Sequence, residues 1–551
     1  MAGTAAAGMQ DLLADVLPLP VSQTREAKAD VVVCGAGPTG LLLACSLQLL
    51  GVDVLVVDPH PTTSRYSKAM VVMPRSMEVL DQVGCATQIS KIGRPVTGVR
   101  VGFPWAWQGT ASGFGKVETP CRFGAVLVGQ NVVEHVLYTR YKALGGRVLR
   151  GARVTDLDQG KKGVSVHVER YLYDREIKLP VPEALQSQDN TTLSCRYLVG
   201  ADGRRSKVRQ KLKVKYEGEA YPQRFWLADF TMTLEEEQRC GFDKYPTQVV
   251  QGNGESLLFV AGEFRRWRMV YVTSRDLEEE PTEELLRAKI QSLSPEPKPR
   301  PDTFQWVTSF QVTCSMVAKY RHRHCFLAGD AAHCHSPAGG QGMNTGLQDA
   351  ANLAWKLAAW LKNLASDLTL ESYSEERVPV AKWVLQNTDR LFRGFVSASA
   401  TQFALRRALI RLVCATVPGD MLPPPAFKTR LHGLSVDYRG SPVVRNVGAT
   451  PPEGALQAGD RLPDLRVVTR SGQATTLLEQ LRPVSLVYRV FMVGWLVNPE
   501  ETHAVVIAFA NGLNAPTKLF IYDGGAPTAR PTGGCWQGAL RMVCGAADKS
   551  Q

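Results

Sequence analysis

The chain has 551 residues, of which 44% are hydrophobic and 21% charged, an ordinary globular composition with enough apolar material for about two to four domains. No apolar run reaches the roughly 18 residues of a membrane-spanning helix, so the sequence predicts no transmembrane segment. The net charge of +12 is spread along the chain without long Lys/Arg blocks, which argues against a nucleic-acid partner and favours attraction of small anions.

The N-terminal stretch is rich in alanine and carries the acidic residues Asp11, Asp15 and Glu26. A transit peptide would be rich in arginine and poor in acid, and a signal peptide would have a longer apolar core after a basic start. We therefore interpret residues 1–27 as a disordered tail and expect a cytoplasmic protein. The twelve cysteines contain no C-x-x-C pair, so we expect reduced, mostly buried thiols rather than a disulfide framework.

A strand–turn–helix–strand unit follows the tail. "ADVVVCG" has the continuous apolar run of a buried parallel strand, "TGLLLACSLQLLG" has the pattern of a helix that ends at Gly51, and "VDVLVVD" is a second strand. The turn between strand and helix contains Gly35, Gly37 and Gly40 in a G-x-G-x-x-G pattern. Here the first glycine permits a tight turn, the second lets a pyrophosphate approach the backbone, and the third lets helix and strand pack closely. Asp58 closes the second strand, where a carboxylate can bind a ribose diol. The unit predicts a dinucleotide site and does not distinguish NAD from FAD.

Two further motifs lie downstream. "YLVGADGRRSKVRQ" has a strand-like start followed by Asp202 and Gly203, which by themselves are a common turn pair. In "CFLAGDAAHCHSPAGGQGMNTGLQDAANLAWKLAAWL" a short strand ends at Gly329 and Asp330, a glycine-rich loop follows, and an amphipathic helix is predicted from Met343 to Leu361. This second strand–loop–helix unit predicts another anion site at a helix N-terminus, and Asp330 could accept hydrogen bonds from sugar hydroxyls.

Together the three motifs resemble the FAD-dependent aromatic hydroxylases, the p-hydroxybenzoate hydroxylase and phenol hydroxylase group of flavin monooxygenases. That group carries a G-x-G-x-x-G, a D-G and a G-D motif in this order, and the resemblance covers about residues 30 to 400. It implies an α/β fold, with a Rossmann-like FAD-binding domain, an inserted β-sheet substrate domain and a C-terminal thioredoxin-like domain. The first glycine turn would then hold the ADP half of FAD.

By the same resemblance, a set of residues is expected to bind the cofactor. The set is Gly35, Gly37, Pro38, Thr39, Gly40, Asp58, Lys68, Gln130, Asp202, Gly329, Asp330, Pro337, Gly342, Met343 and Asn344. Asp58 would bind the ribose, Gln130 the flavin side chain and Asp330 the ribityl chain. Lys68 stands where the family has arginine, so it keeps the charge but loses the bidentate fork. Pro337 would lie near the reactive carbon, and the amides of the last three residues would face the pyrimidine edge of the flavin ring.

A run of histidines and cysteines has the residue types of a metal site. Its members are divided between a predicted strand and the G-D loop, a spacing that suits zinc poorly, so we expect no metal. They are His322, His324, Cys325, His333, Cys334 and His335.

The resemblance implies that NAD(P)H reduces the flavin, that O₂ adds to give a C4a-hydroperoxide, and that this species hydroxylates a phenolic or other electron-rich aromatic ring. NAD(P)H would bind transiently, because no second G-x-G-x-x-G domain is present, and NADH and NADPH are not distinguished. A phenol needs a proton acceptor or relay. The catalytic residue stays open, with Arg65, Tyr66 and His335 as candidates. Two alternative functions also stay open, a Baeyer–Villiger or epoxidising monooxygenase on the same scaffold and a flavin-binding protein without catalysis.

The region between the D-G and G-D motifs alternates in a β pattern and is expected to form the substrate domain. Its aromatic residues are expected to pack the sheet more often than to line a pocket. They are Phe225, Trp226, Phe230, Trp267 and Tyr271.

The expected domain organisation follows from these motifs. The FAD-binding domain comprises residues 28–210 and 315–400, the β-rich substrate domain residues 211–314, the helical linker residues 401–450 and the thioredoxin-like domain residues 451–551. In the linker, "ALRRALIRLV" is amphipathic enough to touch a membrane, but we expect it to pack on the FAD domain. Without a C-x-x-C pair the last domain is expected to be redox-inactive, and it could form a homodimer contact.

Overall fold

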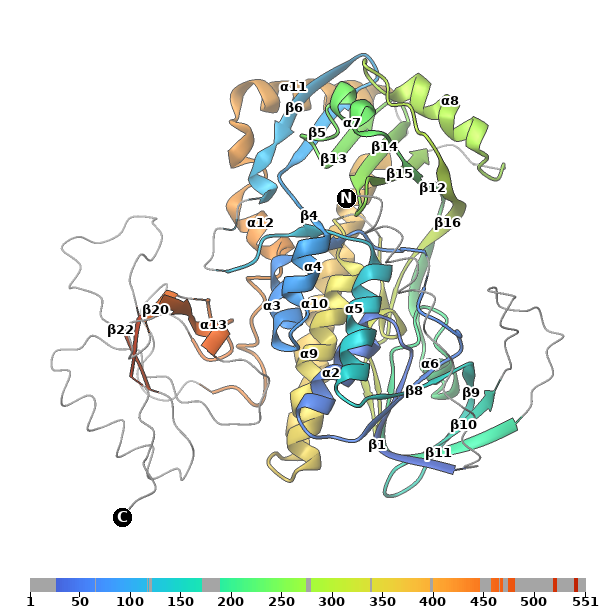
Figure 1. Cartoon of the computed structure of the whole chain (residues 1–551), viewed down its shortest axis with the longest axis vertical. Coiled ribbons are helices and arrows are strands. Elements are labelled where there is room, and N and C mark those ends of the chain that lie inside the picture. The colour runs from blue at the N-terminus through green and yellow to red at the C-terminus, as the bar shows by residue number, and fades with distance from the viewer. Residues whose placement is uncertain are drawn as a thin grey trace.

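The computed structural model describes residues 26–64, 66–115, 117, 121–170, 189–273, 279–336, 339–396, 400–445, 457–464, 466–468, 474–480, 519–522 and 540–543. Two eight-stranded sheets form its main body, one in the lower and one in the upper half of Figure 1, and long helices run between them. The predicted α/β class is confirmed.

The first sheet is parallel at its centre and carries all three motifs. Its strands, in spatial order, are β17 (Arg321–His322), β18 (Cys325–Leu327), β11 (Asp189–Gly200), β1 (Glu26–Cys34), β2 (Val54–Asp58) and β8 (Arg147–Arg150), with β10 (Val164–Arg170) and β9 (Ala152–Gln159) continuing from β11. The valines of β1 are fully buried, as expected for a central strand that is covered on both faces.

The helix that follows β1 has clear start and stop signals. α2 (Pro38–Leu49) begins with proline at its first position, where the missing N–H costs nothing. It ends in a Schellman motif in which Gly51, at φ +70°, donates to Gln48 and Val52 donates to Leu47. The helix end predicted at Gly51 is therefore confirmed.

The other helices of this half surround the sheet. They are α3 (Pro74–Gln82), α4 (Ala86–Ile92), α5 (Gln130–Ala143), the short α6 (Lys207–Lys211), the 3₁₀ turn η2 (Gly329–Ala331), α9 (Gly342–Leu361) and α10 (Asp367–Val396). α9 and α10 form a helical hairpin whose turn lies at the end of the molecule away from the second sheet (Figure 1). A three-stranded sheet of β3 (Val71–Val72), β7 (Val126–Leu127) and β4 (Arg94–Pro95) lies beside them.

The second sheet is mostly antiparallel. Its order is β19 (His333–Cys334), β16 (Phe304–Met316), β12 (Glu217–Thr231), β15 (Arg266–Thr273), β14 (Glu255–Ala261), β13 (Thr247–Gln251), β5 (Val99–Phe103) and β6 (Ala106–Ala111). The sequence assigned only residues 211–314 to a β-rich region, whereas the observed sheet also recruits β5, β6 and β19. The parallel pairing of β5 with β13 joins segments that are far apart in sequence, so no local pattern reveals it.

One face of this sheet forms its own core with α7 (Leu234–Cys240) and α8 (Glu283–Leu293). All five aromatic residues singled out in the sequence are buried, and the indole of Trp267 donates to Glu237 Oε1 at 2.7 Å. The prediction that these residues mainly pack the sheet is confirmed.

The remaining elements are α11 (Ala400–Thr416), the 3₁₀ turns η1 (Ser112–Gly115) and η3 (Gly419–Met421), and α12 (Pro425–Leu431). Near the C-terminus, β21 (Ala474–Thr476), β20 (Arg466–Val468), β23 (Leu540–Val543) and β22 (Leu519–Tyr522) form a four-stranded sheet beside α13 (Leu477–Gln480). A thioredoxin-like domain stays a prediction, as do the domain boundaries.

Two composition-based expectations can be checked on the described residues. Every cysteine among them is a free thiol, and six of the ten are buried. Among the same residues, no helix combines the length and the apolar character needed to cross a bilayer. Most of the tail assigned to residues 1–27 lies outside the described residues.

Candidate cofactor site

The three motifs meet at one edge of the first sheet. Cys34 at the end of β1 is in register with Gly200 at the end of β11, and Gly200 is in register with Leu327 at the end of β18. On the other side Asp58 at the end of β2 is in register with Arg150 at the end of β8. Ligands of open parallel sheets bind beyond these carboxyl ends. The topology thus brings segments that are far apart in sequence to one region at this edge of the sheet, which we call the cleft.

Two glycines of the first turn have the steric roles that the sequence predicted, and the pyrophosphate contact expected at Gly37 stays a prediction. Gly35 has φ +106°, and a Cβ at this position would collide with the carbonyl of Ala201. A Cβ at Gly40 would collide with the carbonyl oxygen of Gly35. At Gly37, by contrast, an added Cβ would have no atom within 4 Å. Gly37 therefore borders open space at the N-terminus of α2, where first-turn amides have no partners inside the helix.

Thr39 has a packing role that the sequence did not indicate. Its side chain lies between the G-D turn and α9, because Cβ atoms added at Gly329 or Gly346 would both approach Thr39 Oγ1 too closely. The Thr39 hydroxyl thus packs at the point where α2, η2 and α9 meet. Pro38, at the first position of α2, is also buried.

This arrangement predicts a rescue. Gly346→Ala should destabilise the protein by about 2 kcal/mol, because the new methyl overlaps Thr39 Oγ1 in a tightly packed site. Adding Thr39→Ala should restore part of that loss, because the remaining Thr39 Cβ would lie 3.6 Å from the new methyl while the close contact with Gly329 Cα, at 3.2 Å, persists. Denaturant unfolding of both single variants and the double variant tests the coupling. Additive losses would show that the two sites do not touch.

Asp58 shapes the glycine turn and faces a cation. Its Oδ2 accepts from the Ala36 amide at 2.6 Å, and its Oδ1 accepts from the His60 amide at 2.8 Å. The guanidinium of Arg150 lies 3.5 Å from Oδ1. Among the described residues, Arg150 Nε and Nη2 are buried and have no hydrogen-bond partner. These donors suit the acceptor-rich ribose or phosphate of a nucleotide. The sequence did not single out Arg150, although its position at the end of an apolar strand was a signal.

The D-G motif lies next to the first turn. Asp202 Oδ2 accepts from the amides of Lys207 and Val208 at 2.7 and 3.2 Å, which fixes the loop at the start of α6. Its Oδ1 is buried and has no partner among the described residues, and burial raises the pKa of this carboxyl. Gly203 has φ +77° and open space around it. The motif is therefore a turn, as its residues suggested, and also presents an acceptor beside the cleft.

The G-D motif and the loop after it lie on the other side of the same cleft. The side chain of Asp330 is exposed, and the positive charges of Lys68 and Arg204 act on its carboxylate. Lys68 is likewise exposed. The structure thus brings Lys68, Arg204 and Asp330 together, and the contacts of Lys68 and Asp330 with a cofactor stay predictions.

The side chain of Asn344 holds the loop before α9 in shape. Its Oδ1 accepts from the Met73 amide at 2.8 Å, and its Nδ2 donates to the carbonyls of Val71 and Gly340 at 3.0 and 2.7 Å. The side chain is fully buried, so only its backbone amide is left for the predicted flavin contact. Met343 is buried in the core. Pro337 lies outside the described residues.

Gln130 begins α5, and its backbone N–H donates to the Ala69 carbonyl at 2.9 Å and to Ser67 Oγ at 2.8 Å. One turn later, buried Glu134 accepts from the Ser64 amide at 2.8 Å. Burial raises the pKa of Glu134 to about 7, although the Ser64 bond and the charges of nearby cations oppose this. The sequence did not indicate Glu134, because its surroundings come from separate segments.

A buried network of charged and polar side chains, centred on Asp349, holds the G-D turn in place. Asp349 on α9 binds His333 Nε2 at 2.6 Å and Arg377 Nε at 2.7 Å, and it accepts from the Gly329 amide at 3.1 Å. Burial by itself would raise the pKa of Asp349, but the charges and hydrogen bonds of His333 and Arg377 outweigh it, so the pKa is lowered. The carboxylate is therefore an anionic anchor for the turn.

His335 is a neutral base at the start of α9. Its Nδ1 donates to the Ser336 carbonyl at 2.9 Å, which leaves a lone pair on Nε2. That atom is buried and has no partner among the described residues, and a Cβ added at Gly342 would lie 3.7 Å from the ring. Burial lowers the pKa of His335 to about 4, so the ring stays neutral near pH 7.

The other candidates from the sequence fall in different places. Tyr66 stacks on Trp306 of the second sheet, with ring centroids 4.9 Å apart, and Arg65 lies outside the described residues. His322 Nε2 lies 3.0 Å from the Lys319 carbonyl, and His324 packs against Tyr197. In the described part of the chain, no three His, Cys, Asp or Glu side chains are grouped as metal ligands.

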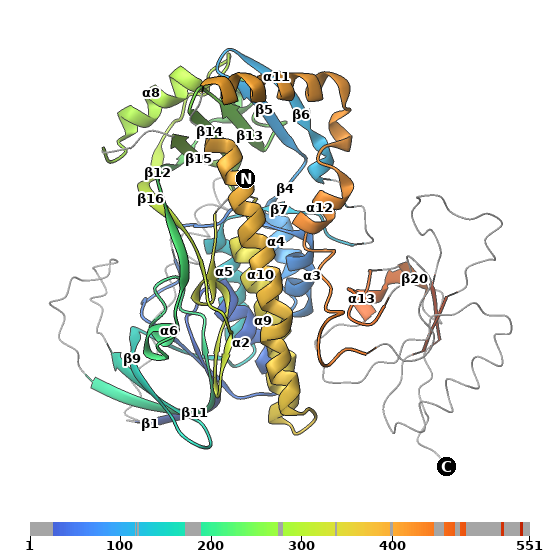
Figure 2. The same cartoon turned by 180° about the vertical axis from the view of Figure 1, so that it is seen from behind.

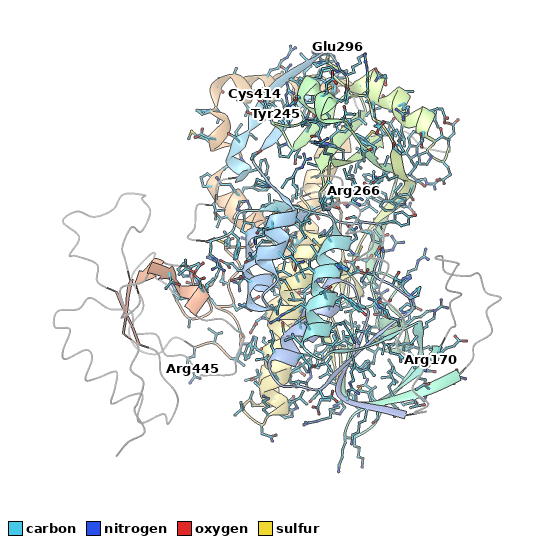
Figure 3. The ribbon with its side chains drawn as sticks, in the orientation of Figure 1. Arg170, Tyr245, Arg266, Glu296, Cys414 and Arg445 are labelled. Atoms are coloured by element: carbon cyan, nitrogen blue, oxygen red, sulfur yellow. The ribbon has the colours of Figure 1, made fainter. Side chains whose placement is uncertain are left out.

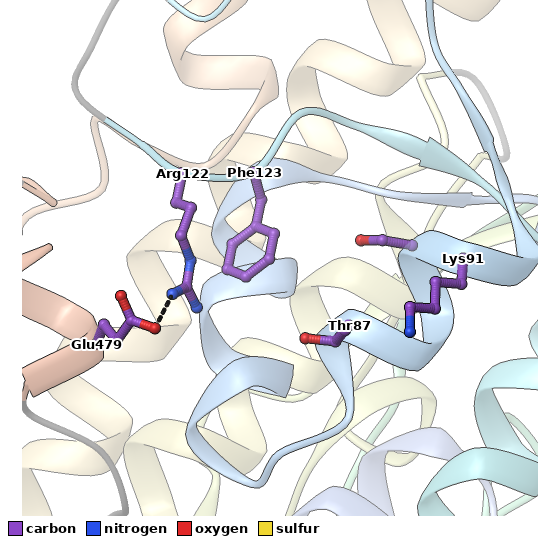
Figure 4. Close-up of a pocket in the computed structure, with 6 residues that line it drawn as sticks. Thr87, Lys91, Arg122, Phe123 and Glu479 are labelled. Carbon is purple, nitrogen blue, oxygen red and sulfur yellow. Dashed lines mark ion pairs between the residues drawn. The ribbon is translucent and has the colours of Figure 1, made fainter. Parts of the chain in front are cut away.

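A separate cavity lies outside this cleft. It has a volume of about 400 Å³ and is lined by Thr87, Ser90, Lys91, Arg122, Phe123 and Glu479 (Figure 4). The ion pair between Arg122 and Glu479, at 3.4 Å, joins the region beside α4 to α13. None of the three motifs contributes to this cavity.

The fold and the cleft define a dinucleotide-binding protein. Two helices begin at the carboxyl edge of a parallel sheet, and Gly37 borders open space there. Among the described residues, buried polar atoms without a hydrogen-bond partner lie on Arg150, Asp202 and His335. Comparison with known proteins identifies the cofactor. The FAD binding domain family matches residues 28–388. Rifampicin monooxygenase of Streptomyces venezuelae is 33% identical over 390 residues, which cover 70% of this chain and 75% of that protein.

Two further similar proteins are also monooxygenases or hydroxylases by name. Pentachlorophenol 4-monooxygenase of Sphingobium chlorophenolicum is 29% identical over 478 residues, or 84% of this chain and 80% of that one. The solved structure of the anhydrotetracycline hydroxylase OxyS from Streptomyces rimosus is 28% identical, has a TM-score of 0.64 and covers 89% of each chain. The chain belongs to the FAD-binding domain family, and it is a flavin-dependent monooxygenase of the aromatic hydroxylase type. The resemblance inferred from the three motifs is confirmed.

Proposed function

We propose that this protein hydroxylates a phenolic or other electron-rich aromatic compound with O₂ and with NAD(P)H as a transient co-substrate. The observation that carries this proposal is the meeting of the three motifs in one cleft. Bound FAD would supply the redox chemistry and the activation of oxygen. The protein's part is to bind FAD, orient the substrate and exclude water.

In this proposal, the turn at Gly37 and the N-terminus of α2 hold the pyrophosphate, and Arg150 with Asp58 holds the adenosine half. Asp330 binds the ribityl chain, and the amides that begin α9 face the ring. The positive end of α9 would stabilise negative charge on the reduced ring.

The substrate would lie between this cleft and the second sheet. Three contacts support the placement: the first joins the loop before Lys68 to the sheet, and the other two hold the partner side chains within the sheet. Tyr66 stacks on Trp306, the guanidinium of Arg268 lies 5.4 Å from the centre of the same indole, and Arg268 is held by a buried bidentate bond to Asp229 at 2.7 and 2.8 Å. An aromatic substrate could pack against such a wall.

His335 is the protein group that we propose as hydrogen-bond acceptor for the reacting hydroxyl. We expect His335→Leu to lower the yield of hydroxylated product about a hundredfold, because acid–base assistance of this kind typically contributes that much or more. Bound flavin should stay, and the reducing equivalents should appear as H₂O₂. His322→Leu, in the same histidine-rich stretch, is the control and should change neither. If His335→Leu still converted its reducing equivalents into hydroxylated product instead of H₂O₂, His335 would have no part in the mechanism.

The function itself is tested by a visible spectrum of the purified protein, followed by consumption of NADPH and of NADH with a panel of phenols. Product and H₂O₂ are both quantified. Bound flavin with phenol-stimulated oxidation and a hydroxylated product is the expected result. Bound flavin without a response to any phenol would favour Baeyer–Villiger oxidation, epoxidation or a non-catalytic role. A cytoplasmic location and a homodimer stay predictions.

A further inference from the structure

Helix α11 presents its apolar face outward. Its inward side contacts the edge of the second sheet, where Phe403 meets Phe103 edge to face and Cys414 lies against Gly109 of β6. On the outward side Leu405, Leu409 and Leu412 are 73%, 59% and 60% exposed. The intervening outward positions are also mostly apolar, with exposed alanines at 404, 408 and 415. The segment packs on β5 and β6, which belong to the second sheet but lie within residues 28–210, the range that the sequence assigned to the FAD-binding domain. The described residues leave its three leucines uncovered.

The exposed apolar surface extends beyond the helix. Trp105, in the turn between β5 and β6, lies under the guanidinium of Arg407 and is half exposed, and Met421 in η3 is exposed as well. Both turns adjoin α11 at the end of the molecule opposite the α9–α10 turn, as both views show (Figures 1 and 2). Figure 3 marks Cys414 at the same end. Several exposed large apolar side chains at one end of a molecule typically mark a binding surface.

The charged side chains of α11 itself are of one sign, whereas the adjoining η3 carries Asp420. α11 contains Arg406, Arg407 and Arg411 and no Asp or Glu. At about 100° per residue, the three leucines fall within about 60° of one another, and Arg406 and Arg411 lie on the two flanks of that face. Long cationic side chains on the flanks of a leucine face can reach the headgroups of a bilayer while the leucines enter its acyl region.

We infer that the outer face of α11, with Trp105 and Met421, docks this protein on an anionic membrane surface. Charge complementarity decides between a bilayer and a second copy of the chain. A two-fold pairing of α11 with itself would bring six arginines together with no acidic residue on either helix. An anionic bilayer instead attracts the two flanking arginines, Arg406 and Arg411, and also covers the leucines.

The test uses the full-length, FAD-loaded protein in sedimentation with vesicles of equal parts phosphatidylcholine and phosphatidylglycerol, and with vesicles of phosphatidylcholine alone. The expected result is binding to the mixed vesicles and much weaker binding to the neutral ones. The variant L405Q/L409Q/L412Q should reduce binding about a thousandfold or more, because each of the three buried leucines is worth about a tenfold or greater change in partitioning. The variant R406Q/R411Q should reduce it about fivefold per arginine.

The matched control is L364Q/L368Q. These two leucines are about half exposed, at 48% and 49%, but lie at the α9–α10 turn, at the opposite end of the molecule. The control variant should bind vesicles like the unmodified protein, and all variants should retain FAD, which shows that they fold. Failure of the unmodified protein to bind mixed vesicles, equal loss in the control variant, or a dimer that the α11 leucine variant splits into monomers would overturn the proposal.

Discussion

Gly37→Ala is expected to weaken FAD binding at least about a hundredfold, or about 2.8 kcal/mol, while the apoprotein keeps its fold. The added methyl would meet no protein atom within 4 Å, and the backbone of Gly37, at φ −78° and ψ 178°, is one that alanine adopts without strain. The space that it occupies is the space where a pyrophosphate would approach the N-terminus of α2. The variant therefore separates binding of the cofactor from folding.

Two companion variants sharpen this experiment. Gly40→Ala should destabilise the apoprotein by about 3 kcal/mol, because its methyl collides with the backbone of Gly35. Gly160→Ala, in the exposed turn between β9 and β10, should affect neither property. Fluorescence titration with FAD and thermal unfolding of the apoproteins are the measurements. If Gly37→Ala bound FAD normally, the pyrophosphate would not lie at this turn.

Arg377→Met is expected to lower the free energy of unfolding by about 3–5 kcal/mol, because it leaves the Asp349 carboxylate buried without its cation. Both side chains are fully buried, and Arg377 also donates to the Thr345 carbonyl and to the Tyr438 hydroxyl. FAD content should fall as well, because Asp349 anchors the amide of Gly329 in the G-D turn. Denaturant unfolding and the flavin absorbance of the purified variant measure the two effects.

The same network determines a pH dependence. The folded-state pKa of Asp349 is lowered below its ordinary value of about 3.9, so its contribution to stability is complete above that pH and is lost as the pH falls through the folded-state pKa. The control for Arg377→Met is Arg147→Met, which breaks an exposed pair with Asp53 and should cost less than about 1 kcal/mol. A loss for Arg377→Met no larger than that would show that the buried pair does not stabilise the fold.

By itself the sequence determined the local units of this protein and its family. The valine run of β1, the glycines of its turn and the cap at Gly51 are each specified within a few residues, because strand burial, positive φ and helix capping depend on local side chains. The order of the three motifs then identified an FAD-dependent hydroxylase. Since parallel strands end at a common edge, it was also predictable that the motifs would share one site.

Tertiary structure alone decided what lies between those units. Arg150, Glu134 and Asp349 come near the motifs only because strand register and helix packing join segments that are far apart in sequence, and no periodicity encodes that distance. The same holds for Thr39, which is expected as a cofactor contact from the motif but packs against Gly329 and Gly346. For α11, the sequence showed an amphipathic helix, and only its docking on β6 decided that the leucines face outward and the residues near Phe403 face inward.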